Sequence, residues 1–135
     1  MTVFIDTSAF YAVFDRDDKN HALAKKTWER LLEEDIVLCT SNYVVVETTA
    51  LLQSRLGFQA VQGFHEDVLP LIHVEPVAGE LHKAGVSALL AALRRKLSLV
   101  DCVNFEVMRS LGIKTVFAFD PHFAEAGFEL IPETA

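Results

Sequence analysis

Isolated carboxylates inside apolar segments are the residues of this chain whose types and spacing could do chemistry. They lie in residues 4–8, 45–49, 99–103 and 117–121, and they are Asp6, Glu47, Asp101 and Asp120. A buried carboxylate is costly unless a cation, a proton or a full set of hydrogen bonds neutralises it. Four acids from distant segments would suit one shared divalent metal site, and ligands that are all oxygen suit Mg²⁺ or Mn²⁺.

The size and composition of the chain are those of one folded domain. It has 135 residues, of which 51% are hydrophobic and 23% are charged, so a substantial core is expected and disorder is not. We therefore expect one domain that covers residues 1–135. No apolar run approaches the roughly 18 residues that span a bilayer, and residues 1–4 lack the basic segment of a signal peptide. We expect a cytoplasmic protein that does not enter the membrane.

The charge balance limits how this protein could meet a nucleic acid. The formal net charge is −7 and the pI is about 5.1, whereas proteins that bind nucleic acid through overall electrostatics are usually basic. Such contact would need local basic patches together with a bound metal. The two cysteines, Cys39 and Cys102, are expected to be reduced and partly buried, without a disulfide or a metal.

Short apolar strands alternate with helices along the chain. Strands are expected at residues 2–5, 36–39, 71–74, 115–119 and 129–131. Helices are expected at residues 7–14, 20–34, 43–56, 59–67, 80–96 and 98–111. Residues 43–49 are ambiguous, because Val and Thr favour strands. The apolar positions nevertheless continue at helical spacing to a stop at Gly57, so a helix is preferred.

This alternation predicts an α/β protein with a parallel sheet and helices on both faces. Ligands of such sheets bind beyond the carboxyl ends of the strands. Asp6 and Asp120 each stand at the carboxyl end of an expected strand. Both acids are therefore expected on the functional edge of the sheet.

Each acid also has an ordinary structural role open to it. Asp120 precedes a proline and could cap a helix, and Asp101 stands three residues after Ser98 and could complete a capping box. Asp6 could form an Asx turn at the end of a strand, and Glu47 could be a surface residue of a helix. These roles are compatible with function, and they do not explain why all four acids occur in matching contexts.

Other charged residues give weaker signals. The five histidines show no metal-ligand spacing. Most are expected at the surface, and His122, the one nearest a proposed site residue, is assigned no function. The run Arg94-Arg95-Lys96 is expected to end the helix at 80–96 and to stabilise its negative end. The alternative for this run is a phosphate-binding patch just before Asp101.

The segments around the four acids resemble the motifs of the PIN-domain family, in the order and spacing of its VapC-type toxin ribonucleases. The resemblance rests on residues 4–10, 42–48, 97–102 and 118–123, and it extends over essentially the whole chain. It implies a three-layer α/β/α sandwich around a central, mainly parallel sheet with strand order 3-2-1-4-5.

The resemblance also implies the chemistry of the site and its partners. The acidic residues of the family are catalytic and hold one or two Mg²⁺ or Mn²⁺ ions. The residues that match them here are Asp6, Glu47, Asp101 and Asp120. Ser8 matches a small polar position that supports the site. Ala118 departs from the Thr or Ser that many members carry two residues before the last acid, which leaves the role of Asp120 open. VapC-type members are typically endoribonucleases, often dimeric and held inactive by an antitoxin, so RNA, an antitoxin and a second copy of the chain are the expected partners.

The corresponding hypothesis is metal-dependent hydrolysis of RNA phosphodiester bonds. A divalent ion acidifies a bound water and stabilises the charge that develops on the phosphate. Asp6 and Asp101 would be the central ligands, Glu47 would complete the shell or hold a water, and Asp120 would help position a second metal. Ser8 would orient a carboxylate or contact the phosphate.

Three other classes of protein compete with this hypothesis. A haloacid-dehalogenase-type phosphatase requires Asp-x-Asp after its first strand, and Ser8 stands at the second position. A receiver domain requires a phosphorylatable Asp after a middle strand, which residues 73–75 do not offer. The remaining alternative is a non-catalytic PIN-like module that binds RNA or protein, which would be expected to lack one or more of the carboxylates.

Overall fold

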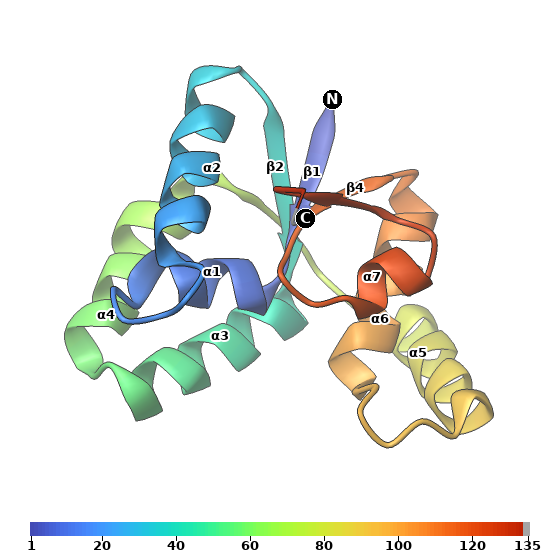
Figure 1. The fold of residues 1–135 in the computed structure, drawn as a ribbon. Coiled ribbons are helices and arrows are strands. Elements are labelled where there is room, and N and C mark those ends of the chain that lie inside the picture. Colours follow the sequence, from blue (N-terminus) through green and yellow to red (C-terminus); the bar gives the residue numbers. More distant parts are fainter. Residues whose placement is uncertain (134–135) are drawn as a thin grey trace.

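Five short parallel strands form the centre of the fold, which a computed structural model describes for residues 1–133 (Figure 1). Within these residues the sheet has the order β3-β2-β1-β4-β5. The strands are β1 (Thr2–Ile5), β2 (Val37–Ser41), β3 (His73–Glu75), β4 (Thr115–Phe117) and β5 (Glu129–Ile131). The predicted parallel sheet and its strand order are both confirmed.

The central strands are continuous apolar runs because both of their faces are covered. Val3, Phe4 and Ile5 of β1 are completely buried. Phe4 is aligned with Cys39 of β2 on one side and with Val116 of β4 on the other. Burial on both faces removes the alternation of polar and apolar residues that a half-exposed strand would show.

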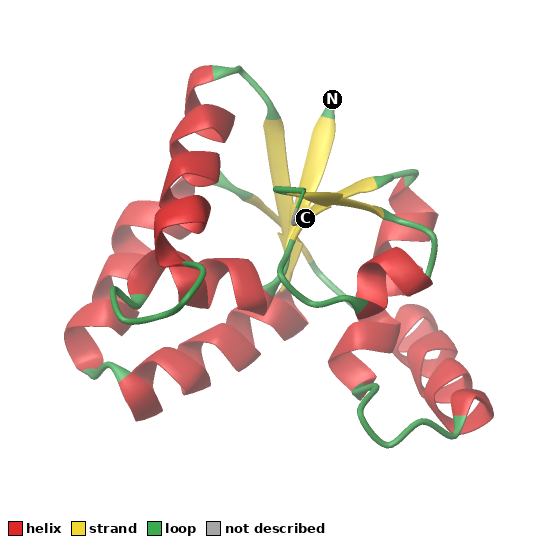
Figure 2. Cartoon of the chain, viewed as in Figure 1, coloured by secondary structure: helices red, strands yellow, loops and turns green. Residues whose placement is uncertain are grey.

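Helices cover both faces of the sheet, which makes the three layers expected from the sequence (Figure 2). On one face lie α1 (Thr7–Phe14), α2 (His21–Glu33), α3 (Asn42–Arg55) and α4 (Phe58–Gly63). On the other face lie α5 (Gly79–Ala92), α6 (Leu99–Leu111) and α7 (His122–Glu125). A π turn (Phe64–Val68) and a 3-10 turn (Leu69–Leu71) lead from α4 into β3. None of the helices in the described residues is long and apolar enough to cross a membrane.

The sheet has a topological switch point between β1 and β4. From β1 the chain proceeds outward to β2 and then β3, whereas β4 is added on the opposite side of β1 and is followed by β5. The helices that leave β1 and β4 therefore run along opposite faces, and the carboxyl ends of these two strands border an opening. The fold thus places the residues that follow Ile5 and Phe117 at the position where α/β proteins bind ligands.

Most element types match the expectations, but several boundaries differ. The helix preferred for residues 43–56 is present as α3, capped by Ser41, whose Oγ accepts from the backbone N of Val44 at 3.2 Å. The strand expected at 36–39 is shifted to Val37–Ser41, and those expected at 71–74 and 115–119 are shorter or shifted. Asn20 precedes α2 without making a side-chain cap.

The largest difference is the end of the helix expected at 80–96. Helix α5 ends at Ala92, because Leu93 takes a left-handed conformation with φ of 54°. The chain then turns back so that Ser98 can start α6 against α5. The three basic residues that follow Leu93 therefore lie in a loop and not in the last helical turn.

Both cysteines are buried and neither forms a disulfide. Burial is the main cause that raises the pKa of the Cys39 thiol to about 11, and it also raises the pKa of the Cys102 thiol. The reactive thiolate is therefore scarce at neutral pH. Both side chains are thus more deeply buried than the partial burial expected from the sequence.

Helices α5 and α6 approach each other closely at Gly85. This residue is buried, and a Cβ atom added there would lie 2.5 Å from Cγ2 of Val103 and 3.3 Å from its Cα. We expect Gly85→Ala to lower the free energy of unfolding by about 1 kcal/mol, because overpacking of about 1–3 kcal/mol outweighs a gain in helix propensity of about 1 kcal/mol. Urea unfolding measures the change.

Gly79, at the start of the same helix, is the matched control, because an added Cβ would have nothing within 4 Å. Gly79→Ala should leave the unfolding midpoint unchanged or raise it slightly. Equal midpoints for the two variants would show that α5 and α6 can separate without cost.

Candidate metal centre

The carboxyl ends of β1 and β4 open into a hollow of about 390 Å³. It is lined by Asp6, Thr7, Ser8, Glu47, Leu51, Lys96, Ser98, Asp101 and Asp120. All four acids singled out in the sequence therefore border one hollow, although they come from the ends of two strands and from two helices. Ser8, expected as a supporting residue, lines it as well.

Asp6 follows β1 directly and is the N-cap of α1. Its Oδ2 accepts hydrogen bonds from the backbone N of Ser8 at 3.2 Å and from the Ser8 hydroxyl at 2.7 Å. Its Oδ1 accepts from Nδ2 of Asn104 at 3.3 Å. Desolvation by burial is the largest influence on this group and raises the pKa of Asp6 to about 7, against the opposing effect of the Ser8 hydrogen bonds. The negative charges of Asp101 and Glu47 raise it further.

Asp101 lies in the first turn of α6 and completes a capping box with Ser98. Its Oδ2 accepts from the backbone N of Ser98 at 3.1 Å, while its own backbone N donates to the Ser98 hydroxyl at 3.1 Å. Burial raises the pKa of Asp101, and the nearby charge of Asp120 acts in the same direction. The capping box predicted for Asp101 is thus confirmed, and its hydrogen bonds orient the carboxylate at the hollow.

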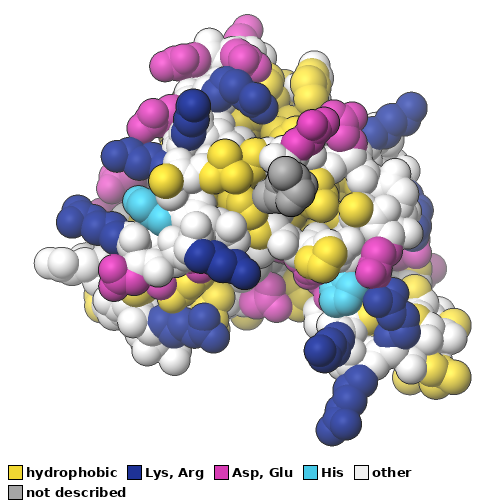
Figure 3. Space-filling view, in the orientation of Figure 1, with side chains coloured by type: hydrophobic (Ala, Val, Ile, Leu, Met, Phe, Trp, Pro, Cys, Tyr) yellow, Lys and Arg dark blue, Asp and Glu magenta, His cyan; other side chains and the backbone are white. Residues whose placement is uncertain are grey.

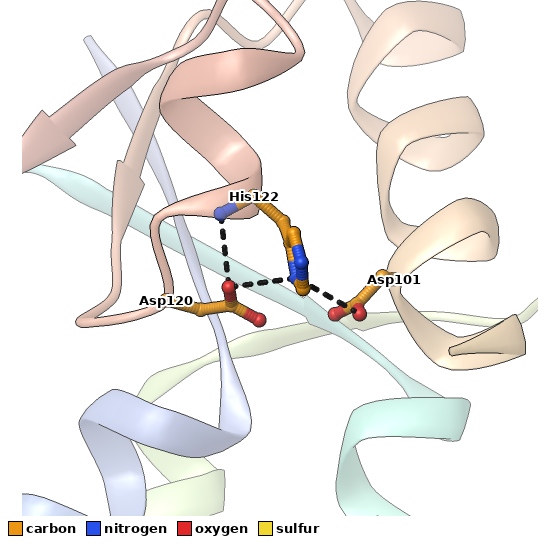
Figure 4. A group of neighbouring side chains, drawn as sticks. All are labelled: Asp101, Asp120 and His122. Atoms are coloured by element: carbon orange, nitrogen blue, oxygen red, sulfur yellow. Dashed lines mark hydrogen bonds and ion pairs between the residues drawn. The ribbon is translucent and has the colours of Figure 1, made fainter. Parts of the chain in front are cut away.

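Asp120 and His122 follow β4, and the ring of His122 lies between the carboxylates of Asp120 and Asp101 (Figure 4). The backbone N of His122 donates to Oδ1 of Asp120 at 2.9 Å. The ring Nδ1 of His122 lies 3.0 Å from Oδ1 of Asp120 and 3.6 Å from Oδ2 of Asp101. This Nδ1 is buried yet has no well-directed hydrogen bond. One ligand atom from each of the three residues lies within 4.8 Å of the others, close enough to hold one metal ion.

Glu47 is brought to the hollow by the way α3 is fixed. Ser41 caps the helix, and the fully buried Thr48 donates from Oγ1 to Oγ1 of Thr7 at 3.1 Å. This bond ties α3 to the start of α1, next to Asp6. Glu47 is half-buried and lines the hollow.

Two polar residues of this region were not anticipated from the sequence. Asn104 is fully buried and binds Asp6, and its Oδ1 has no hydrogen-bond partner. It stands three residues after Asp101, so helical spacing places both on one face, and this signal was available. The second is His122, to which the sequence analysis assigned no function; in the structure its ring lies beside Asp120 and Asp101.

The donor chemistry of the hollow fits a divalent cation. Burial and the negative charges of neighbouring acids raise the pKa values of Asp6 and Asp101, which is the situation that a bound cation relieves. Asp6, Glu47, Asp101 and Asp120 supply an all-oxygen set suited to Mg²⁺ or Mn²⁺. His122 would add an imidazole, a ligand that transition metals favour over Mg²⁺.

Known proteins share this architecture along nearly the full chain. The PIN-domain profile matches residues 3–129. The 23S rRNA-specific endonuclease VapC20 of Mycobacterium tuberculosis is 36% identical over 133 residues, which are 97% of this chain and 99% of the relative.

Solved structures agree with the sequence comparison. The crystal structure of M. tuberculosis VapC20, described as a toxin that cleaves the sarcin-ricin loop, superposes with a TM-score of 0.84 at 35% identity and covers 93% of this chain and 95% of its own. FitAcB of Neisseria gonorrhoeae has a TM-score of 0.69 at 15% identity, with 96% of both chains covered. FitAB bound to an IR36 DNA fragment has a TM-score of 0.69 at 16% identity, with 97% and 94% covered. The two Fit structures share the fold.

Because the profile and the VapC20 relative both span almost the whole chain, the chain belongs to the PIN-domain family, in the VapC-type group that its four acids resemble.

Proposed function

We propose that this chain is a metal-dependent endoribonuclease that hydrolyses RNA phosphodiester bonds in the acidic hollow. The observation that carries the proposal is the convergence of Asp6, Glu47, Asp101 and Asp120 at the switch point between β1 and β4. The full-length similarity to a 23S rRNA-specific endonuclease supports the choice of RNA as substrate. Conversely, a non-catalytic binding module would have no need to keep four carboxylates in one hollow.

A divalent ion in this hollow would acidify a water molecule and offset charge on the scissile phosphate. Asp6 and Asp101 would be its central ligands, because both are buried and both line the hollow. Glu47 would complete the ligand set or hold a water, and Asp120 would contribute together with His122, whose ligand atoms lie within 4.8 Å of one of Asp101. Ser8 keeps the Asp6 carboxylate oriented by donating to Oδ2, while its own oxygen accepts from the backbone N of Phe119 at 3.0 Å.

The similarity to VapC20 supports a proposal for the substrate. Ribosomal RNA is the proposed substrate, and the sarcin-ricin loop is the segment to test first, because that relative is described as cleaving it. We also propose that the chain is the toxin of a toxin–antitoxin pair, works in the cytoplasm and forms a homodimer. Co-expression with the product of the neighbouring gene, followed by measurement of the mass of the complex, tests both partners.

Asp6→Asn should lower the rate of RNA cleavage by at least about 100-fold, because it removes a central ligand and the charge that attracts the metal. The measurement is primer-extension mapping of total RNA after incubation with the protein and Mg²⁺ or Mn²⁺. Asp17→Asn is the matched control, because Asp17 is an exposed acid in the turn between α1 and α2. Full cleavage by wild-type protein in excess EDTA would refute the proposed metal dependence.

Metal-free protein should lose stability as the pH rises through about 7. The pKa of Asp6 is raised from 3.8 to about 7 in the folded protein. The folded state therefore binds this proton more tightly than the unfolded state, and the resulting stabilisation is fully present below pH 3.8 and is lost as the pH rises through about 7. Added Mn²⁺ should then raise the melting temperature more above pH 7 than below it, because the ion competes with the proton.

Thermal melts of wild type and Asp6→Asn at several pH values check this expectation. The variant should show a flatter pH profile and a smaller metal shift. A wild-type protein that Mn²⁺ fails to stabilise at any pH would favour the non-catalytic module instead.

A further inference from the structure

The loop between α5 and α6 carries three consecutive cations, Arg94, Arg95 and Lys96. The sequence suggested that they stabilise the negative end of the preceding helix. In the structure α5 ends at Ala92 and has no basic residue in its last turn. The charges therefore lie beyond the helix, and their position calls for another explanation.

The loop is fixed at both ends. Nη2 of Arg94 pairs with Oε2 of Glu125 at 3.0 Å, which ties the loop to α7, the helix that follows Asp120. At the other end Leu97 is buried and Ser98 caps α6. The loop is therefore in contact with α7 at Arg94 and with the start of α6 at Leu97 and Ser98, and Lys96 between these contacts lines the hollow.

The charges of Arg95 and Lys96 are not neutralised by ion pairs within the described residues, so they can interact with a bound molecule. Both are exposed, and among the residues that the structure describes neither has an ion-pair partner within 4.0 Å. Lys96 lines the same hollow as the four acids without pairing with any of them. Figure 3 shows dark-blue side chains projecting at the lower right, where Figure 1 places this loop.

This placement matters because the chain has a net charge of −7 and the hollow itself is acidic. The four acids of the hollow repel an RNA strand that approaches it, and the charge of Lys96 offsets this repulsion locally. Contacts between cationic side chains and backbone phosphates fix the position and orientation of a nucleic acid without reading its sequence.

We propose that Arg95 and Lys96 bind RNA backbone phosphates on nucleotides that flank the cleaved bond, and so position the strand across the hollow. This inference rests on the proposed function for the identity of the bound strand. Arg95 suits two-point contact with phosphate oxygens, and Lys96 acts as a point charge. Both are positioning residues, and the acids in the hollow carry the chemistry.

The test compares Arg95→Ala/Lys96→Ala with the control Lys25→Ala/Lys26→Ala, which removes two exposed lysines from α2. Binding is measured in the Asp6→Asn background, so that the RNA stays intact, by fluorescence anisotropy of a fluorescein-labelled RNA stem-loop over a series of KCl concentrations. Removal of the loop cations should weaken binding on the order of tenfold at low salt. It should also reduce the slope of log affinity against log salt by about 0.7–0.9 for each phosphate that the variant no longer neutralises.

In the otherwise wild-type protein, the loop variant should raise KM with little change in kcat, since it removes binding that is shared by substrate and transition state. Arg95→Lys/Lys96→Arg should restore most of the salt slope. Melting temperatures establish that every variant is folded.

An affinity and salt slope equal to those of the α2 control would overturn the inference, even if wild-type protein cleaves RNA. Conversely, a wild-type protein that binds RNA through the loop but cleaves none with Mg²⁺ or Mn²⁺ would refute the nuclease proposal and leave the loop's role in binding intact. The two failures are therefore distinguishable, because the binding assay does not depend on cleavage.

Discussion

The carboxylate of Asp6 is the group around which the site is organised. It lies at the end of the central strand β1, and hydrogen bonds reach it from α1 through Ser8 and from α6 through Asn104. The Ser8 hydroxyl also accepts from Phe119, so the segment after β4 is joined to the same point. These neighbours satisfy the oxygen atoms but do not neutralise the charge, and burial still raises the pKa of Asp6 to about 7. The Asp6 carboxylate is thus oriented by hydrogen bonds but has no cationic partner among the groups that bond it.

Sheet topology explains why the other acids gather at the same place. The chain leaves β1 toward one face and β4 toward the opposite face, so the carboxyl ends of these adjacent strands leave a space that no crossover helix fills. Asp6 and Asp120 follow the two strands, and Asp101 enters the space from the first turn of α6. Glu47 reaches it from α3, which a buried Thr48–Thr7 hydrogen bond attaches to α1. Convergence therefore requires no unusual local conformation, only this strand order and short connections.

Local sequence patterns predicted part of this arrangement, namely the strands, most helices and the four acids. Apolar runs marked the strands, a capping box marked the start of α6, and Gly112 marked its end. The four acids stood out because charge inside an apolar run is costly. The end of α5 was missed because Leu93 and the basic residues after it have good helix propensity, and tertiary contacts, which local propensity does not report, return the chain to α6. His122 was missed because its relation to Asp101 exists only after folding, although its neighbour Asp120 was recognised.

Charge is distributed over the site in a way that separates chemistry from positioning. The acids lie inside the hollow, where desolvation strengthens their attraction for a divalent ion, whereas the cations of the α5–α6 loop are exposed and only Lys96 among them lines the hollow. A cation buried among the acids would neutralise them and compete with the metal; Lys96 lines the hollow but makes no ion pair with them. The Arg94–Glu125 ion pair joins the loop to α7, the helix that follows Asp120. An acidic protein can in this way act on a polyanion: a metal ion and a few placed cations supply positive charge where the phosphates come closest, and the remaining surface need not attract RNA at all.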